Sequence, residues 1–352
     1  FFYTAYEYMN QNPEGSLIQR FITTQQMMQG NFSPSYLSSL GPNFANGTFK
    51  LDANPPCPNT CTNNVNLPGG IIPASLIDPN SVALWKTMPQ PNIDPNSNAT
   101  GANYQYLVSQ PVKRWEYRLR GDYNISEKMK VFVSWNRQDE TDLNPISIWW
   151  GTNNDLPYPS SMPANQVSQV LSANVTNIFT PTLTNEFVFA TATFINPIGL
   201  TDASAVDPAK VGFNMVGLYK NPYTPQIPNT LSWGNGVPGY FAPTFGQEWQ
   251  GGNFGKLSQA PNISDNLSKV LGTHTLKFGF YWDLQRNQQT GSNFGGANQG
   301  VLDFENYGSQ SSNNPAADFV MARVTWFTQA NSSPVQDFQQ HQYSFYANDQ
   351  WK

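Results

Sequence analysis

The clearest pattern along the chain is a strict alternation of apolar and other residues within short segments. In LKFGFYWDL, which runs from Leu276 to Leu284, every second residue is apolar, and the residues between are polar, glycine or tyrosine. Successive side chains of a β-strand point to opposite faces, so this segment is predicted to be a strand with one apolar and one polar face. No stretch offers the roughly 20 apolar residues that a transmembrane helix needs.

Three segments read as strands on both sides of a short turn and are predicted hairpins: residues 113–138, 167–196 and 261–287. The first arm of the third hairpin alternates poorly, because Asp265 falls between Ile263 and Leu267. The first turn is placed at residues 125–127. The second lies at residues 180–184, where Pro181 suits a turn better than a central strand. The third uses Gly272 followed by Thr273, because glycine at the first central position favours a type II′ turn.

Long loops alternate with these short turns. Residues 1–12 and 339–352 are predicted single strands, and residues 13–112, 139–166, 197–260 and 288–338 are predicted loops. Loops beyond about 12–15 residues are rare in compact soluble domains, whereas outer-membrane β-barrels have short turns on one side and long loops on the other. The predicted fold class is all-β: one partial domain that is an antiparallel transmembrane β-barrel segment with long extracellular loops.

Composition supports this choice and removes others. Charged residues make up 12% of the chain and aromatic residues 14%, and the mean hydropathy is −0.47. A soluble β-sandwich explains the alternation equally well, but it explains neither the low charge nor the asymmetry of turns and loops. The net charge of −5 argues against a nucleic-acid partner, because phosphate binding needs clustered Lys and Arg.

The two faces of the predicted strands are assigned to different surroundings. The residues predicted to face lipid are Leu276, Phe278, Phe280, Trp282 and Leu284. Those predicted to be polar and lumen-facing are Glu116, Arg118, Arg120, Asp122, Lys277 and Asp283. Two interpretations of the charges near Arg118 stay open: a charge-paired wall that docks a plug, or a polar rung on a substrate path.

No catalytic or metal site is predicted. The motif CPNTC places Cys57 and Cys61 in one short segment, which favours a small disulfide loop over a pair of free thiols. Two Cys and two distant His cannot supply a four-ligand zinc site. His274 and His341 are each assigned a structural or solvent-exposed role, and the common hydrolase and phosphate-binding motifs are absent. The chain is predicted not to be an enzyme and to need no cofactor.

Both ends of the chain suggest a piece of a longer protein. It opens with FFYTAYEYMN, which lacks a start Met and the basic region of a signal peptide, and it ends within a strand-like pattern at Trp351. About seven strands cannot close a large barrel, and an open edge in lipid leaves backbone groups unpaired at several kcal/mol each. This piece alone is therefore expected to be neither a stable membrane protein nor a transporter.

Several motifs, in their order along the chain, resemble one family. They are FFYTAYEYMNQ, IPASLIDPNSVALWKTMPQPN, RLRGDYNISEKMKVFVSWNRQDE, PTLTNEFVFATATF, DNLSKVLGTHTLKFG, AADFVMA and YSFYANDQWK. Together they resemble the barrel of Oar-like TonB-dependent outer-membrane receptors, which carry an N-terminal carboxypeptidase-regulatory-like domain. The resemblance covers nearly the whole chain, although no single motif decides it.

The resemblance implies the N-terminal part of a roughly 22-stranded barrel with a plugged lumen in the bacterial outer membrane. Such receptors bind a substrate through extracellular loops and import it with energy from an inner-membrane complex. The implied partners are outer-membrane lipid, the protein's own plug and remaining strands, a TonB-type energy-coupling protein and an unknown substrate. The plug and the C-terminal strands are absent from this sequence. Two alternatives stay open: a passive porin-like or adhesin-like barrel, and a soluble secreted β-protein that binds carbohydrate.

Overall fold

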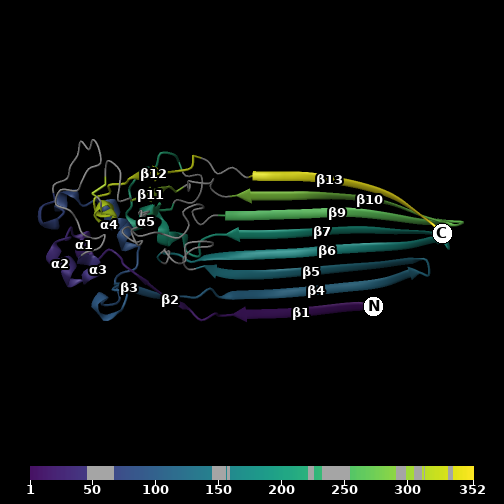
Figure 1. The fold of residues 1–352 in the computed structure, drawn as a ribbon, viewed down its shortest axis with the longest axis horizontal. Coiled ribbons are helices and arrows are strands. Elements are labelled where there is room, and N and C mark those ends of the chain that lie inside the picture. Colours follow the sequence, from purple (N-terminus) through teal and green to yellow (C-terminus); the bar gives the residue numbers. More distant parts are fainter. Residues whose placement is uncertain are drawn as a thin grey trace.

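The computed structural model describes residues 1–45, 67–144, 156, 159–220, 226–231, 254–290, 299–304, 311–312, 314–331 and 336–352. Its main element is an eight-stranded antiparallel sheet with strand order β1-β4-β5-β6-β7-β9-β10-β13 (Figure 1). The strands are β1 (Phe2–Gln11), β4 (Val112–Ser126), β5 (Met129–Asn144), β6 (Met162–Thr180), β7 (Leu183–Ile198), β9 (Phe254–Leu271), β10 (His274–Thr290) and β13 (Gln336–Trp351). The prediction of an all-β fold with antiparallel strands is confirmed.

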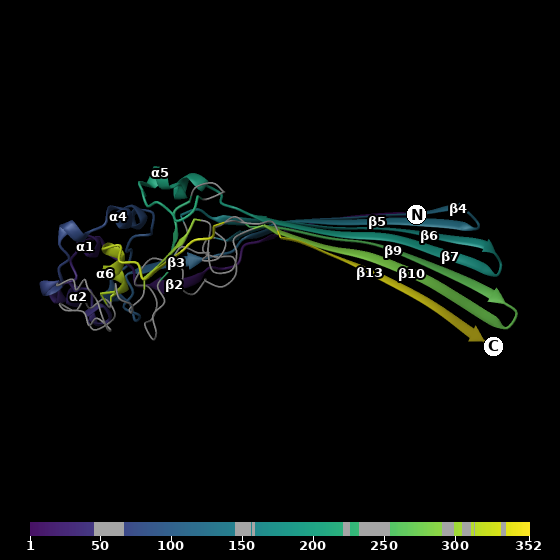
Figure 2. The same ribbon diagram turned by 90° about the horizontal axis from the view of Figure 1, so that it is seen from above.

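The sheet is a single open layer. Within the described residues β1 pairs only with β4 and β13 only with β10, so the first and last strands do not meet. Viewed from its edge, the sheet carries no second layer along most of its length, and its strands fan apart toward the turn end (Figure 2). An eight-stranded barrel closes by pairing its first and last strands, whereas this sheet stays open between β1 and β13 within the described residues.

The three tight turns lie at one end of the sheet, and each is shifted along the strand direction relative to the one before it. Ser126 pairs with Met129 before the first turn, Thr180 pairs with Leu183 before the second, and Leu271 pairs with His274 before the third. The pairings across the sheet show that each turn lies two residues further along than the one before it. A drift of one residue per strand corresponds to a strand tilt of about 35°, given about 3.3 Å per residue and 4.8 Å between strands. Barrels that span outer membranes have strand tilts of about 35–45°.

The long connections at the other end fold into a body that we call the loop cap, made of the described parts of residues 16–108, 199–231 and 299–331 (Figure 1). Its strands are β2 (Ser16–Arg20), β3 (Tyr104–Val108), β8 (Asn229–Leu231), β11 (Val301–Asp303) and β12 (Trp326–Thr328). Its α-helices are α1 (Gln25–Met28), α2 (Pro34–Ser39), α3 (Pro42–Ala45), α4 (Pro79–Lys86), α5 (Pro208–Val211) and α6 (Pro315–Val320). Its 3₁₀ helices are η1 (Pro68–Gly70), η2 (Ala74–Leu76), η3 (Pro95–Ser97) and η4 (Ala203–Val206).

Local sequence explains why the cap helices are short and well defined. Thr24, Ser33, Asp78 and Asn314 each cap a helix by accepting a hydrogen bond from a backbone N–H of its first turn. Proline follows the cap residue of α2, α4 and α6, where its missing N–H costs nothing. These caps fix the helix starts, so residues that lack a long helical period still form helices.

The cap has its own hydrophobic core. The fully buried side chains include Met27, Phe32, Leu37, Phe44, Leu84, Phe304 and Phe319. These residues come from segments far apart in the sequence, and all six residues of α6 are buried among them. The segments predicted as featureless loops therefore need a correction, because their spaced apolar residues collapse into one core that helices and short strands build.

Strand boundaries also differ from the sequence pattern. The three hairpins predicted at residues 113–138, 167–196 and 261–287 occupy 112–144, 162–198 and 254–290. The strands extend past the apolar alternation because backbone pairing continues through polar residues near the loop end. The first turn consists of Glu127 and Lys128 rather than residues 125–127, since Ser126 still pairs with Met129 across a register shift.

Candidate functional site: the polar face of the sheet and the loop cap

One face of the sheet carries most of its apolar side chains. Paired residues of neighbouring strands share a face, and the row through Phe280 joins Val131, Val175, Phe187, Asp265 and Phe345. Leu276, Phe278, Phe280, Trp282 and Leu284 all lie on this face. Leu276 and Leu284 are about 26 Å apart along the strand at 3.3 Å per residue, which becomes about 22 Å of height at the tilt above. The apolar band of an outer-membrane barrel is about 25 Å tall.

The opposite face is polar, and it carries every residue predicted to face the lumen. Glu116, Arg118, Arg120 and Asp122 lie on the same face of β4, opposite Gln138, Asn136, Ser134 and Phe132 of β5. Lys277 and Asp283 lie on that same face of β10, where they pair with Ser268 and Asn262 of β9. The register thus groups these six residues, while the lumen itself stays a prediction.

The charges on β4 form short ion pairs along the strand. Arg118 Nε donates to Glu116 Oε1 at 2.7 Å, and Arg120 donates to both carboxylate oxygens of Asp122 at 3.0 and 2.8 Å. Arg114 Nη1 lies 3.7 Å from Glu140 Oε2 of β5. Exposed pairs of this kind contribute about 0–1 kcal/mol each. They balance charge on this part of the face more than they stabilise it.

The other half of the polar face, on β6 to β13, is dominated by amides, hydroxyls and small residues. Asn174 Nδ2 donates to Glu186 Oε1 at 2.7 Å, and Gln285 Nε2 donates to Asp283 Oδ2 at 3.2 Å. The Asp283 side chain is 6% exposed, and its Oδ1 has no hydrogen-bond partner among the described residues. A buried carboxylate oxygen without a donor is costly, so this atom marks a place where a donor is expected.

A glycine lets an aromatic ring lie flat on the same half of this face. Gly279 pairs with Tyr346, and a Cβ on Gly279 would overlap the Tyr346 ring. The ring reaches across β10, and its hydroxyl donates to Asn266 Oδ1 of β9 at 3.0 Å. Gly279 is therefore required by close packing rather than by its backbone conformation, which sequence alternation alone could not show.

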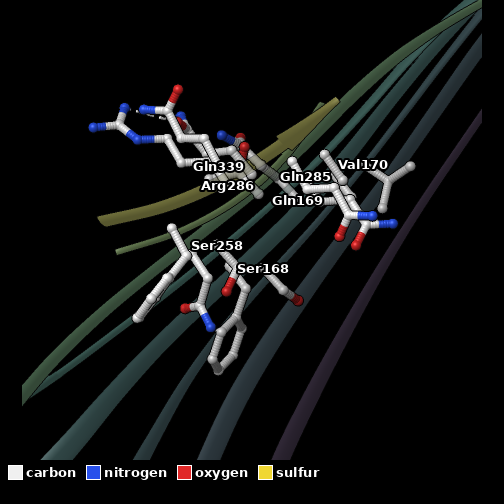
Figure 3. A pocket seen from close by; sticks show the side chains of 15 residues that line it. Ser168, Gln169, Val170, Ser258, Gln285, Arg286 and Gln339 are labelled. Carbon is white, nitrogen blue, oxygen red and sulfur yellow. Dashed lines mark hydrogen bonds between the residues drawn. The ribbon is translucent and has the colours of Figure 1, made fainter. Parts of the chain in front are cut away.

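The sheet carries a pocket of about 660 Å³ near its loop end. Figure 3 shows side chains from β6, β9, β10 and β13 around it. By register, Ser168, Val170, Ser258 and Gln285 belong to the polar face, whereas Gln169, Arg286 and Gln339 belong to the apolar one. Ligand pockets usually measure about 300–1,000 Å³, so this pocket has room for a small molecule.

The apolar face also carries polar residues, and the sequence pattern indicated only some of them. Asp265 interrupts the alternation of β9, and Asn185 Nδ2 of β7 donates to its Oδ1 at 2.6 Å. Toward the loop end, Arg137 donates to both carboxylate oxygens of Asp139 at 2.8 Å. Arg286 makes a similar pair with Asp337, at 2.9 and 2.7 Å. The last two pairs lie beyond the apolar band and define its limit on this side.

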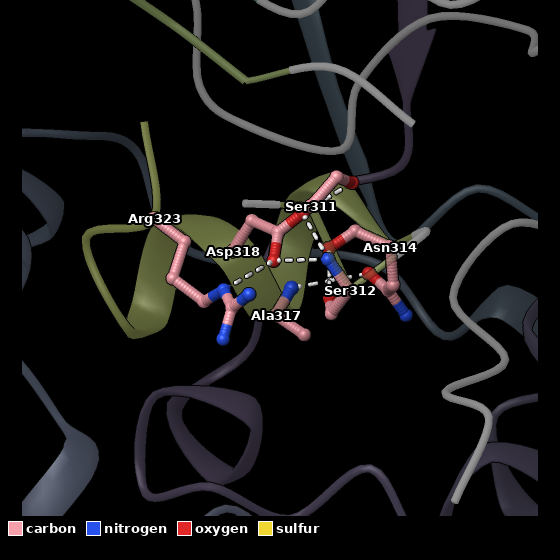
Figure 4. Close-up of polar contacts among 6 residues, drawn as sticks. All are labelled: Ser311, Ser312, Asn314, Ala317, Asp318 and Arg323. Atoms are coloured by element: carbon pink, nitrogen blue, oxygen red, sulfur yellow. Dashed lines mark hydrogen bonds and ion pairs between the residues drawn. The ribbon is translucent and has the colours of Figure 1, made fainter. Parts of the chain in front are cut away.

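Among its described residues, the loop cap contains one buried carboxylate. Asp318 of α6 is fully buried and accepts from the Ser311 hydroxyl at 2.8 Å and from the Ser312 backbone N–H at 2.8 and 2.9 Å (Figure 4). Arg323 Nε lies 3.9 Å from Asp318 Oδ1. Burial raises the pKa of Asp318 to about 6, although the hydrogen bonds from Ser312 and Ser311 and the Arg323 charge oppose this. The arrangement ties the preceding segment to the start of α6.

The histidines take part in ordinary surface contacts. His274 Nδ1 lies 2.8 Å from Asp349 Oδ2, and its ring stacks on Trp351 at the turn end. His341 Nδ1 accepts from Trp282 Nε1 at 3.3 Å. No group of acidic, His or Cys side chains within the described ranges could hold a metal ion. The predicted Cys57–Cys61 disulfide lies outside the described residues.

No described helix has the length and apolar character to cross a membrane. The family described as Outer membrane beta barrel domain matches residues 1–352 of the chain. The chain belongs to this family. It is therefore an outer-membrane β-barrel domain of bacterial origin, and the tilted sheet with its apolar face is the structure that this environment requires. A search among curated proteins found no match, and neither did a search among solved structures.

Membership of this family allows each end of the sheet to be assigned to one side of the outer membrane. Such barrels have short turns on the periplasmic side and longer loops outside the cell. The tight turns before Met129, Leu183 and His274 fit the periplasmic side, and the loop cap fits the extracellular side.

Proposed function

We propose that this barrel domain is part of the wall of a TonB-dependent receptor of the Oar-like type, which binds a substrate on its extracellular side and imports it. The observation that carries the proposal is the open, gently curved wall. Within the described residues β1 and β13 each keep a free edge, which supports a wall that fills only part of a larger circumference. Barrels of about 22 strands enclose a plugged lumen, and free backbone edges in lipid are too costly to persist.

The two faces support the same proposal. The apolar face, including Phe278 and Phe345, would contact lipid, and the polar face would line the lumen. The ion pairs of Arg118 and Arg120 leave the wall polar yet nearly balanced in charge, which suits contact with a plug that must move. The order of motifs along the chain adds the resemblance to this receptor type.

The loop cap supports an extracellular binding role. Loops of a passive pore need only avoid blocking it, whereas these loops form a body with its own core around Phe44 and Phe319. A preformed body loses less conformational entropy when it binds a ligand. We infer that the domain itself catalyses no reaction and that its work is recognition and transport.

The test uses the complete gene product, purified from outer membranes and placed in planar lipid bilayers. A plugged receptor is expected to show no steady conductance, and deletion of the plug segment is expected to open a large one. In cells, a photo-cross-linker in the N-terminal segment should capture the inner-membrane energy-coupling protein. A steady conductance of the intact protein, together with no cross-link, would instead assign the domain to a passive porin.

A further inference from the structure

Charge is unevenly distributed over the polar face. On β1, β4 and β5 this face carries Glu7, Arg114, Glu116, Arg118, Arg120, Asp122, Lys130, Glu140 and Asp142. On the five strands from β6 to β13 it carries only Glu186, Lys256, Lys277 and Asp283. Glu186 and Lys277 lie near the turns, so the middle and upper part of this half is almost free of charge.

Small side chains hollow out this neutral half near the loop end. Val170, Ala192 and Ala260 form one row across β6, β7 and β9, and the same row continues through Gln285 to Gln340. The next row toward the loops contains Ser168, Phe194, Ser258, Asn287 and Phe338. Most of the residues that line the 660 Å³ pocket belong to these two rows (Figure 3).

The chemistry of these two rows is that of hydroxyl recognition. Gln and Asn amides each donate and accept hydrogen bonds, as ligand hydroxyls do. One row closer to the turns lies Asp283, buried and with Oδ1 unpartnered, while its Oδ2 accepts from Gln285. Gln285 also lines the pocket. Asp283 itself does not line the pocket, so it would act on a ligand by holding in place the Gln285 amide that does.

Other ligand classes fit less well. An anionic chelate or nucleotide needs free Arg or Lys, but the nearby Arg286 is paired in a bidentate way with Asp337. Lys256 lies over the Phe194 ring, 5.9 Å from its centroid. A peptide that binds as an added strand needs a free backbone edge. Here β7 and β9 are paired on both sides, and the edge of β13 is expected to pair with a further strand of the barrel. Phe194 and Phe338 add apolar faces on which a sugar ring can pack.

We propose that this neutral half of the polar face binds a short, uncharged oligosaccharide, with Gln285 as a hydrogen-bonding residue and Asp283 as the residue that positions the Gln285 amide. The inference rests on the receptor function proposed above, because it assigns that receptor's substrate class. The ligand would meet this surface below the loop cap, in the upper part of the wall. Removal of a hydrogen-bonding partner, or of the residue that positions it, weakens binding of a hydroxylated ligand by about tenfold or more.

The experiment uses the complete protein in detergent micelles. An array of short neutral oligosaccharides, anionic ferric chelates and uncharged tripeptides is screened, and the tightest ligand is titrated by calorimetry. The expected result is a neutral oligosaccharide whose Kd rises about tenfold or more in Asp283→Ala and Gln285→Ala. Asp283→Asn, which keeps an acceptor oxygen, should stay within a few-fold of the parent. Arg118→Ala, on the charged half, should leave the Kd unchanged.

Several outcomes would overturn the inference. They are binding of chelates or tripeptides alone, no binding to the array by a correctly folded protein, or an oligosaccharide Kd that Asp283→Ala does not change. Loss of binding in Asp283→Asn equal to that in Asp283→Ala would indicate a bound cation instead. Folding is checked in every variant by the heat-dependent gel mobility of barrels. Conductance and cross-linking do not depend on this site, so failure of the receptor proposal would be seen separately.

Discussion

The sheet and the loop cap differ in how far their apolar side chains are exposed. In the cap, Phe44 and Phe319 are 0% exposed, because loops fold around them. In the sheet, Phe345 is 77% exposed and Phe278 is 45% exposed, and no second layer covers them. A soluble protein rarely leaves such a contiguous apolar surface open. The difference shows that the two regions are built for different solvents: the cap hides its apolar residues from water, whereas the sheet presents them to lipid.

The largest expected effect is a loss of stability in the loop cap that leaves the sheet unchanged. Phe319→Ala removes a fully buried ring that packs edge-on against Phe304, with centroids 5.5 Å apart. Deletions of this size cost about 3–5 kcal/mol. The cap of the complete protein should become sensitive to protease while the barrel keeps its heat-dependent gel mobility. Leu218→Ala, at a side chain that is 68% exposed, is the matched control and should change neither property.

A charge on the apolar face tests the sheet alone. Phe278→Arg would place a guanidinium between Leu267 and Ala347, at a cost of about 2–4 kcal/mol near the bilayer midplane. The variant should assemble poorly into lipid vesicles, as measured by gel mobility, and its cap should stay protected where assembly occurs. Tyr281→Arg, on the polar face between Ser264 and Ser344, should assemble normally. Equal defects in both variants would contradict the assignment of the faces.

The sequence revealed the sheet far better than the cap, for a physical reason. Strand periodicity is local, so Leu276 to Leu284 shows both faces without knowledge of any neighbour. Register also follows, because Gly272 and Thr273 fix one turn and pairing then places Lys277 and Asp283 on the face of Arg118. The cap core joins residues as distant as Phe44 and Phe319, and no local period records that they meet.

The sequence likewise revealed one part of the polar face and not the other. The charges on β4 were visible because they alternate along one strand. The neutral half was not, because its pocket depends on small residues brought together from three strands, such as Val170, Ala192 and Ala260. One signal was available: β6 is rich in Asn, Gln and Ser and has no charged residue, and the same holds for residues 257–264 of β9. The strand register is needed to show that these residues lie side by side on one surface.

The third prediction concerns pH and again separates the cap from the sheet. The pKa of Asp318 is about 6 in the folded cap, above its ordinary value of 3.8. The folded cap therefore holds this proton more tightly than the unfolded segment does, so cap stability is greatest below about pH 4, falls as the pH rises toward 6 and is level above that. Two pKa units correspond to about 3 kcal/mol. Hydrogen exchange of residues 314–323, corrected for intrinsic rates, should show this loss of protection.

Two substitutions locate that effect. Asp318→Asn keeps an acceptor for the Ser312 N–H without a titratable group, so it should remove the pH dependence between 4 and 6 and preserve protection at neutral pH. Asp318→Ala removes the acceptor of the Ser311 hydroxyl and the Ser312 N–H, at a cost of about 1–3 kcal/mol. Retention of the full pH dependence in Asp318→Asn would assign it to another group. The sheet should show no response to either change.

The smallest predicted effect concerns packing on the polar face of the sheet. Its polar face is open to solvent in this structure, yet the Tyr346 ring lies so close to Gly279 that a Cβ there would overlap it. Gly279→Ala would push the Tyr346 ring away and break its hydrogen bond to Asn266, which should cost about 1–3 kcal/mol. Tyr346→Ala should cost about 1 kcal/mol through the same bond. The double variant should then cost clearly less than the sum, since the clash disappears with the ring. Additive costs in vesicle-unfolding titrations would mean that the ring does not lie on Gly279, and that packing in this region of the wall is as loose as its exposure suggests.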